Sequence, residues 1–297
     1  MRRSALFSLC ALFALRAATA SGQATEEWRS WNQPVEPFRI AENLYYVGAS
    51  DIASYLITTP EGHILIDGGF VETAPQIEAN VVKLGFKLAD VEILLNSHAH
   101  FDHAGGLAEL KAATGARVFA SAADATLLES GGKGDFRFGD EGQFPPVAVD
   151  RRLADGEKVT LGGAELTAHL TPGHTRGCTT WTFKADALDV VVVCSASILD
   201  YRFVGRESYP GIAADYARTF ATLKALPVQI FLAPHGGFFD LAGKRERAAK
   251  GMGLRNPWVD PAGYKAWVER MEGAFVAALE KQREEEKNLE KRKQELQ

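Results

Sequence analysis

Residues 98–103 read HAHFDH and hold three of the seven histidines of the chain together with a carboxylate. Side chains alternate on an extended segment, so His98, His100 and Asp102 are expected to point the same way, with His103 joining from the turn that follows. A catalytic zinc takes about three protein ligands and leaves one position open for water. Four clustered ligands therefore predict two adjacent metals that recruit further ligands, in preference to a solvated polar loop.

Two later histidines supply those further ligands. His174 lies in the turn TPGHT, and His235 lies in PHGG, directly after the apolar run 229–232. Loops at strand ends are favourable places for ligands because a rigid sheet fixes their backbone. Two sites are then complete, one formed by His98, His100 and His174, and the other by Asp102, His103 and His235.

The motif HAHFDH, followed by TPGHT and then PHGG, resembles the metallo-β-lactamase superfamily, and the likeness covers nearly the whole mature chain. The resemblance implies an α/β fold, a four-layer αββα sandwich with a two-zinc site at one edge, and the same six ligands. The segments WNQP (31–34), NLYYVG (43–48) and ASYLI (53–57) are similar to the third subclass of metallo-β-lactamases. That subclass has a serine at a strand end where the other two subclasses have a metal-binding cysteine, and a histidine takes over the coordination.

The strand end in question reads VVVVCSAS over residues 190–197. The resemblance places Ser195 at the cysteine position, and it implies that Ser197, and also Ser195, hydrogen-bond a substrate carboxylate, with Tyr201 near the substrate. Cys194 is expected to face away from the metals as a buried apolar thiol. Glyoxalase-type hydrolases of the superfamily carry a metal-bridging aspartate at this strand end. None is present here, which argues against that branch.

Two further points remain open on the residues alone. Cys178 and Cys194 flank an expected hairpin, so a disulfide and two free thiols are both compatible with the sequence, and free thiols are favoured because Cβ orientation cannot be read from it. For Asp67, in the segment IDGG, the resemblance implies an aspartate that orients the ligand histidines. Its alternative is an aspartate that caps a turn.

The two ends of the chain have their own patterns. Residues 1–20 show the charged, apolar and small-residue order of a signal peptide, which predicts a periplasmic or secreted protein, and the apolar run is too short to anchor it in a membrane. Residues 21–279 are expected to form one metallo-β-lactamase domain. Residues 280–297 predict a charged, solvated helical tail, in preference to a self-associating one, so a monomer is favoured.

Charge excludes one class of partner. The formal net charge is −5, and cleavage after residue 20 removes three arginines and no acids to give −8. No basic run with interleaved aromatic residues is present, so we expect no nucleic acid as partner. Apolar periodicity predicts strands near 45–47, 54–58, 63–67, 91–95, 158–161, 166–170, 179–183, 190–193 and 229–232, and helices near 73–84, 104–113, 213–225 and from 258 onward.

The resemblance implies a function. It is the hydrolysis of the β-lactam amide bond of antibiotics, and hence antibiotic resistance, by a hydroxide that two zinc ions make available at neutral pH, without a covalent intermediate. Asp102 is then both a ligand and the group that orients the hydroxide. The main alternative is another secreted hydrolase of this fold that acts on a lactone, ester or phosphodiester. A non-catalytic zinc-binding module is a weaker alternative, because all six expected ligands are present.

Overall fold

The structure is a computed structural model that describes residues 26–251 and 256–296 of the 297-residue chain. The expected signal peptide over residues 1–20 lies outside the described residues. Among the described residues, no helix combines the length and the apolar character needed to cross a membrane.

The first of two central β-sheets is built from the first half of the chain. Its strands are neighbours in sequence order, antiparallel from β1 to β4 and parallel from β4 to β7. They are β1 (Phe38–Ala41), β2 (Leu44–Tyr46), β3 (Tyr55–Thr59), β4 (Gly62–Ile66), β5 (Val91–Leu95), β6 (Arg117–Ser121) and β7 (Arg151–Leu153).

The second sheet comes from the second half, in the order β12-β11-β10-β9-β8. All of its neighbours pair antiparallel except β11 and β12, which are parallel. Its strands are β8 (Lys158–Leu161), β9 (Ala164–Leu170), β10 (Thr179–Ala185), β11 (Leu188–Val192) and β12 (Ile230–Leu232).

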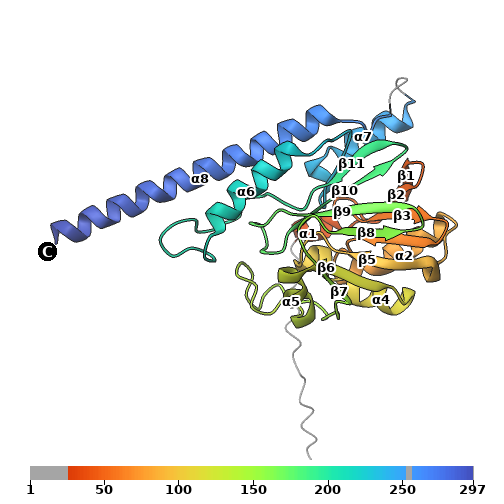
Figure 1. Cartoon of the computed structure of the whole chain (residues 1–297), viewed down its shortest axis with the longest axis horizontal. Coiled ribbons are helices and arrows are strands. Elements are labelled where there is room, and N and C mark those ends of the chain that lie inside the picture. The colour runs from red at the N-terminus through yellow and green to blue at the C-terminus, as the bar shows by residue number, and fades with distance from the viewer. Residues whose placement is uncertain (1–25, 252–255, 297) are drawn as a thin grey trace, which may run out of the picture.

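Helices cover the outer faces of both sheets (Figure 1). On the first sheet these are α2 (Ala74–Lys83), α4 (Leu107–Thr114) and α5 (Ala122–Ser130), and on the second α6 (Ile212–Ala225), α7 (Leu241–Ala249) and α8 (Pro261–Glu295). Shorter elements are α1 (Glu26–Trp31), α3 (Phe101–Ala104) and the 3-10 helices η1 (Val71–Thr73), η2 (Leu88–Asp90) and η3 (Gly236–Phe238). The expected four-layer αββα sandwich is confirmed.

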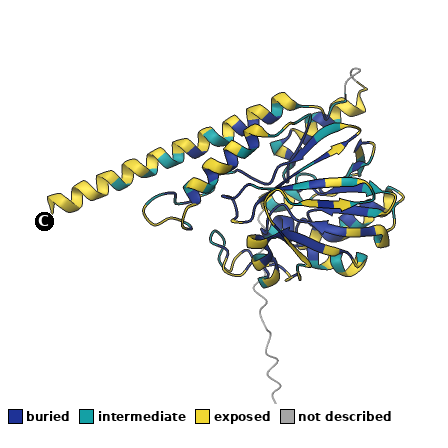
Figure 2. Ribbon diagram, in the orientation of Figure 1, coloured by how far each residue is buried: buried dark blue, intermediate teal, exposed yellow. Residues whose placement is uncertain are grey.

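Two apolar cores follow from this layering. One lies between the sheets and continues under α6 and α8, with Trp181, Phe220 and Trp267 fully buried in it. The other lies between the first sheet and α2 and α4, where Ile77 and Leu107 are buried. Figure 2 shows the strands and inward helix faces dark blue, whereas the far end of α8 is exposed. The central strands β4 and β5 are covered on both sides, which explains the apolar runs ILI and ILL that they contain.

The order of the strands brings the predicted ligands to one edge. β4, β5 and β6 are parallel, so their carboxyl ends lie at the same edge. The HAHFDH segment leaves β5 there, His174 lies in the β9–β10 loop, and His235 follows β12. The helix expected over 104–113 is α4, which begins at Leu107, and Gly105 and Gly106 separate it from the short α3. A Cβ at Gly106 would collide with the Gly68 carbonyl oxygen, so the chain at Gly106 can approach the loop after β4 this closely only with glycine there.

Candidate metal centre

Two buried aspartates fix the ligand loop between β5 and α3. Asp67 accepts hydrogen bonds from the Ser97 amide (2.6 Å) and the Asn96 side chain (3.1 Å), and Asp124 accepts one from the Ala99 amide (3.0 Å). Burial raises the pKa of both carboxyls to about 6, although these hydrogen bonds act in the opposite direction. The backbone of the loop is thus held on both sides of His98.

Asp124 also joins this loop to the loop that carries His174. Its carboxylate accepts from the Thr175 hydroxyl (2.8 Å) and the Gly177 amide (2.9 Å). Asp124 therefore connects ligands from the first and second halves of the chain. It begins α5 together with Ser121, whose hydroxyl accepts from the Asp124 amide. Sequence reasoning missed Asp124, although Ser121-x-x-Asp124 is a helix-start pattern that signals this local structure.

The structure brings all six predicted ligands together. Ligand atoms of His98, His100 and His174 lie within 4.8 Å of one another, and so do those of His98, Asp102 and His103. The sixth residue completes the second group: His235 Nε2 lies 3.2 Å from His103 Nε2 and 3.5 Å from Asp102 Oδ2. The two groups adjoin at His98.

In most of these histidines one ring nitrogen already has a partner, which leaves the other for a metal. Nδ1 of His98 lies 3.0 Å from the Ser97 hydroxyl, Nδ1 of His174 lies 3.3 Å from the Ser197 carbonyl oxygen, and Nδ1 of His235 lies 2.8 Å from Asp51 Oδ2. Nε2 of His98 and His174 is then left for a metal, whereas Nε2 of His235 lies toward Asp102, so that a metal bound there would replace a proton. Such partners orient the imidazole of a metal ligand and fix its tautomer.

His100 is oriented the other way. Its Nε2 is buried 3.7 Å from Asp135 Oδ2, a carboxylate that also accepts from the amides of Arg137 and Phe138. Nδ1 of His100 is thus the nitrogen left for a metal. Neither Asp51 nor Asp135 was predicted from the sequence, because each is brought to its histidine only by the fold and no local motif marks it.

The charge states of the ligands suit a cation. Burial, together with neighbouring histidines, holds the pKa of His98 and His174 well below the usual range, so both rings are neutral and keep a free lone pair. The pKa of Asp102 is also held well below its usual range: burial opposes this, but the charges and hydrogen bonds of His103 and His235 outweigh it. Neutral imidazoles with one carboxylate are a donor set that zinc prefers.

The cluster opens into a cavity of about 610 Å³. Its polar floor includes His100, Asp102, His174 and His235, with Ser197 and Asp51 beside them. Aromatic side chains form much of the wall, and Trp28 packs on Phe101 with ring centres 4.8 Å apart. The remaining aromatic members of the wall are Trp31, Phe138 and Phe238.

The comparisons with known proteins agree with this geometry. The sequence model of the Metallo-beta-lactamase superfamily matches residues 47–235, which include all six ligands. The chain belongs to the metallo-β-lactamase superfamily.

Solved structures of metallo-β-lactamases are similar to nearly the whole described fold. A Cronobacter sakazakii metallo-β-lactamase with a HARLDQ motif is 44% identical, with a TM-score of 0.84, over 86% of this chain and 99% of that one. FEZ-1 of Legionella gormanii is 46% identical, with a TM-score of 0.81, over 85% and 98%. The class B3 di-zinc metallo-β-lactamase LRA-12, from an Alaskan soil metagenome, is 38% identical, with a TM-score of 0.79, over 84% and 96%. The predicted likeness to the third subclass is confirmed.

Curated relatives found by sequence carry a different name. A hydroxyacylglutathione hydrolase of Rhodospirillum rubrum is 30% identical over 156 residues, 52% of this chain and 51% of that protein. The chain spans about half the length of the curated relatives it matches.

The three residues predicted to contact substrate in this metallo-β-lactamase-fold chain have different surroundings. Ser197 lines the cavity, whereas Ser195 is buried beneath it and shares a hydrogen bond of 2.9 Å with the Ser197 hydroxyl. Tyr201 is also buried, and its hydroxyl donates to the His174 carbonyl oxygen (3.0 Å). The geometry therefore assigns contact with the cavity to Ser197, and support of Ser197 and His174 to the other two.

Asp67 has no hydrogen bond to a ligand ring in the described part of the chain. Its bonds go to Ser97 and Asn96, so it orients the ligand loop through the backbone. Its φ of 64° lies in the left-handed region, a strained conformation for a non-glycine residue that is retained where the surroundings fix it. The carboxylate that does hold a ligand ring is Asp51.

Cys178 and Cys194 form a disulfide, with Cα atoms 5.7 Å apart. The expectation of free thiols is wrong. β10 and β11 pair antiparallel with Trp181 opposite Val192, which brings the residue before β10 close to the strand extension after β11. Both sulfur atoms are thereby bonded to each other, and neither is available to a metal.

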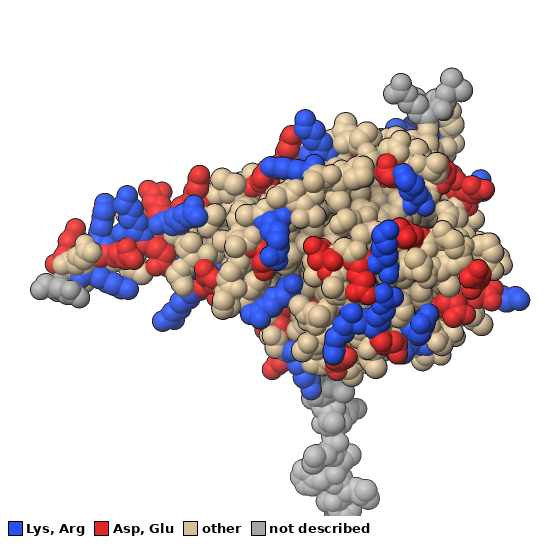
Figure 3. All heavy atoms as spheres, viewed as in Figure 1, with Lys and Arg blue, Asp and Glu red and all other residues tan. Residues whose placement is uncertain are grey.

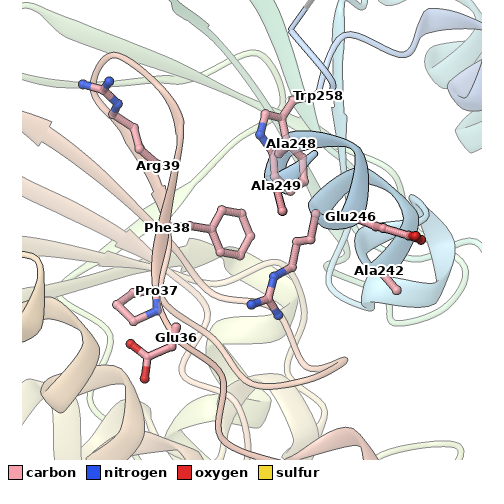
Figure 4. Close-up of a pocket in the computed structure, with 10 residues that line it drawn as sticks. Glu36, Pro37, Phe38, Arg39, Ala242, Glu246, Ala248, Ala249 and Trp258 are labelled. Atoms are coloured by element: carbon pink, nitrogen blue, oxygen red, sulfur yellow. The ribbon is translucent and has the colours of Figure 1, made fainter. Parts of the chain in front are cut away.

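A second hollow, of about 580 Å³, lies between β1 and α7 and shares no residue with the metal cavity (Figure 4). Phe38 points across it and stacks on Trp258, with ring centres 5.1 Å apart, and Arg245 lies over the Phe38 ring. It contains no histidine or cysteine.

Proposed function

We propose that this chain hydrolyses the amide bond of β-lactam antibiotics with two zinc ions, one held by His98, His100 and His174, the other by Asp102, His103 and His235. The observation that carries the proposal is the similarity to solved metallo-β-lactamases over most of this chain and nearly all of theirs. One of these relatives, LRA-12, is a di-zinc enzyme. The six ligands divide evenly between two such sites.

Bound zinc would lower the pKa of a shared water to about 7 and polarise the substrate carbonyl. Side chains of the protein would orient the attacking water and hold the ligands in place. Asp102 stays ionised, so it can accept a hydrogen bond from the attacking water while it serves as a ligand. The hydrogen bond between His235 and Asp51 limits movement of that ligand during the reaction, and Asp135 lies 3.7 Å from His100 on the side away from the metals.

Substrate binding is assigned to the cavity wall. The Ser197 hydroxyl borders the cavity and can donate a hydrogen bond to the carboxylate that β-lactams carry on their fused ring. Trp28, Trp31 and Phe138 offer apolar surface to the rest of the substrate and exclude water from the reacting bond. No nucleophilic side chain is required for this reaction.

Hydrolysis of a hydroxyacylglutathione thioester is the second candidate, because curated relatives carry that name. Two observations favour the β-lactam. Those relatives match over about half of this chain, and residue 195 is serine where the glyoxalase-type resemblance would require a bridging aspartate. A lactone, ester or phosphodiester substrate stays an alternative within the same fold.

A substrate panel tests the proposal. The zinc-loaded protein is assayed with a penicillin, a cephalosporin, a carbapenem, a simple lactone and a hydroxyacylglutathione. We expect kcat/KM to be highest for at least one β-lactam, and to be lost after chelation or in His235→Ala. A higher kcat/KM for the thioester or the lactone than for every β-lactam would contradict the proposal.

We also propose that the protein acts in the periplasm or is secreted. The order of residues 1–20 supports this, and so does the disulfide of Cys178 and Cys194, since such bonds persist in oxidising compartments. Cell fractionation that finds the protein in the cytoplasm with an uncleaved N-terminus would contradict it.

A further inference from the structure

The long C-terminal helix continues beyond the sandwich. α8 spans 35 residues, and Phe275 is its last buried residue. Figure 1 shows the second half of α8 projecting past the sheets, and Figure 3 shows basic and acidic side chains interspersed along it. A mainly charged helix of this length needs tertiary contacts to be held in place. The first part of α8 packs on α6 and β12. Beyond Phe275, its described hydrogen bonds and ion pairs to other elements are made with the segment after Ser197, which runs to the start of α6.

One amide side chain makes the closest of these contacts. Gln282 donates from Nε2 to the Tyr201 carbonyl oxygen (2.7 Å) and accepts from the Phe203 amide at Oε1 (2.6 Å). It thus holds the backbone on both sides of Arg202. The Arg202 guanidinium lies 3.4 Å from Glu285 and 3.1 Å from Glu286 of the same helix.

Aromatic packing continues this contact inward. The Phe203 ring lies edge-on to Phe275 of α8 (5.2 Å), and Phe275 stacks on Tyr216 of α6 (5.3 Å). Tyr216 in turn donates its hydroxyl to the Ser197 carbonyl oxygen (2.9 Å). The segment after Ser197 is therefore held between α6 and α8.

The held segment supports a predicted metal ligand. The Tyr201 hydroxyl donates to the His174 carbonyl oxygen (3.0 Å) and lies 3.4 Å from His174 Nδ1. The Ser197 hydroxyl lies 3.3 Å from the same nitrogen. Gln282 binds the Tyr201 backbone, and Tyr201 binds His174. Gln282 is thus connected to His174 through one intervening residue.

We propose that Gln282 is a positioning residue: through its two hydrogen bonds, the C-terminal helix extension keeps Tyr201 and Ser197 in the places where they hold His174 toward the cavity. The inference rests on the proposed function only for its effect on hydrolysis. We expect Gln282 to contribute more than the neighbouring ion pairs, because the Arg202 pairs are partly exposed and screened by salt.

The test compares Gln282→Ala with Gln294→Ala, the same substitution at an exposed position nearer the end of the same helix. Three quantities are measured: amide hydrogen exchange of residues 198–211, the rate at which zinc passes to a chelator, and kcat and KM for the β-lactam that wild type hydrolyses best. For Gln282→Ala we expect faster exchange confined to this segment and zinc release faster by about tenfold, the scale seen when support of a ligand is lost. A fall in kcat larger than the change in KM should accompany these effects, and Gln294→Ala should match wild type.

Two outcomes would overturn the inference. One is wild-type zinc release and exchange in Gln282→Ala. The other is a uniform rise in exchange over the whole fold with a lowered Tm, which would show a merely structural residue. Because exchange and zinc release need no substrate, they decide the role of Gln282 even if wild type hydrolyses no β-lactam, a result that would contradict the proposed function alone.

Discussion

Ser195 and Ser197, the two serines after β11, differ in their access to the cavity, and removing each hydroxyl in turn tests this difference. Both hydroxyls belong to one hydrogen-bonded pair, yet only Ser197 borders the cavity. We expect Ser197→Ala to lower kcat/KM for a carbapenem by about 1 to 3 kcal/mol, or roughly 5- to 150-fold, mainly through KM, because a hydrogen bond to a charged substrate group is lost. Ser195→Ala is the matched control and should have the smaller effect. Equal kcat/KM for wild type and Ser197→Ala, at verified zinc occupancy, would remove Ser197 from the binding site.

His235 predicts a pH dependence in the metal-free protein. Burial lowers its pKa, but hydrogen bonds to Asp102 and Asp51 outweigh burial and raise the pKa to about 9. A raised folded-state pKa means that the stabilisation is fully present below the unfolded value of about 6.5 and is lost as pH rises through 9. We expect His235→Asn to cost roughly 1 to 3 kcal/mol at pH 6 and much less near pH 10.

The measurement is urea unfolding of both metal-free proteins at pH 6, 7.5, 9 and 10. The quantity compared is the difference in unfolding free energy between wild type and His235→Asn. A difference that stays constant, or that grows with pH, would show that His235 is not held as a cation between the two carboxylates.

Residues of the site were predictable to different degrees. The six predicted ligands could be singled out because their side-chain types are rare, are clustered, or follow apolar strands, and the structure brings them together. Asp51 and Asp135 were not found, because a carboxylate on a loop is common and its histidine partner is distant in sequence. The role of Tyr201 was expected at the substrate, but burial turns its hydroxyl to His174. Reactive groups are therefore easier to recognise in a sequence than the groups that hold them in position.

At the level of elements, strong apolar periodicity was sufficient to predict a strand or helix, and weak periodicity was not. β5 and β9 begin within about two residues of the predicted positions, since both are long apolar or alternating runs. β6 and α5 were not predicted, because their short apolar pattern is interrupted by small residues. The missing prediction of α5 affects the site, because Asp124 on this helix joins two ligand loops.

The disulfide between the β10 and β11 ends belongs to this scale too. Its cysteines are 16 residues apart, and closing a loop of that size restricts the unfolded chain by about 3 kcal/mol. We expect the double variant Cys178→Ser/Cys194→Ser to lose about that much unfolding free energy while it binds as much zinc as wild type. Metal analysis and urea unfolding measure the two effects. Loss of zinc in a variant that stays folded would show that this pair of strand ends contributes to the metal site directly.

At the scale of the whole molecule, the metal centre is where the two halves of the chain meet. Residues 98–103 follow β5 of the first sheet, whereas His174 and His235 follow strands of the second. Much of the remaining contact between the sheets is apolar and without direction. A few hydrogen bonds also cross, such as the one from the Tyr55 hydroxyl to the Ala233 carbonyl oxygen (2.6 Å). Ligands shared between the two sheets therefore make metal binding a link between layers, and zinc should stabilise the sandwich as a unit.

Zinc removal tests that link. A ligand that binds only the folded state at 100 times its Kd adds about 2.7 kcal/mol, which for a domain of this size raises Tm by roughly 5 to 10 °C. We expect chelation to lower Tm by that amount, and titration back to wild-type Tm to take two zinc equivalents per chain. His235→Ala lacks one ligand of the second site, so its titration should end near one equivalent with a smaller gain in Tm. Wild type that reaches full Tm and full activity with one equivalent would contradict the two-zinc assignment, and a Tm unaffected by chelation would show that the two layers hold together without the metal.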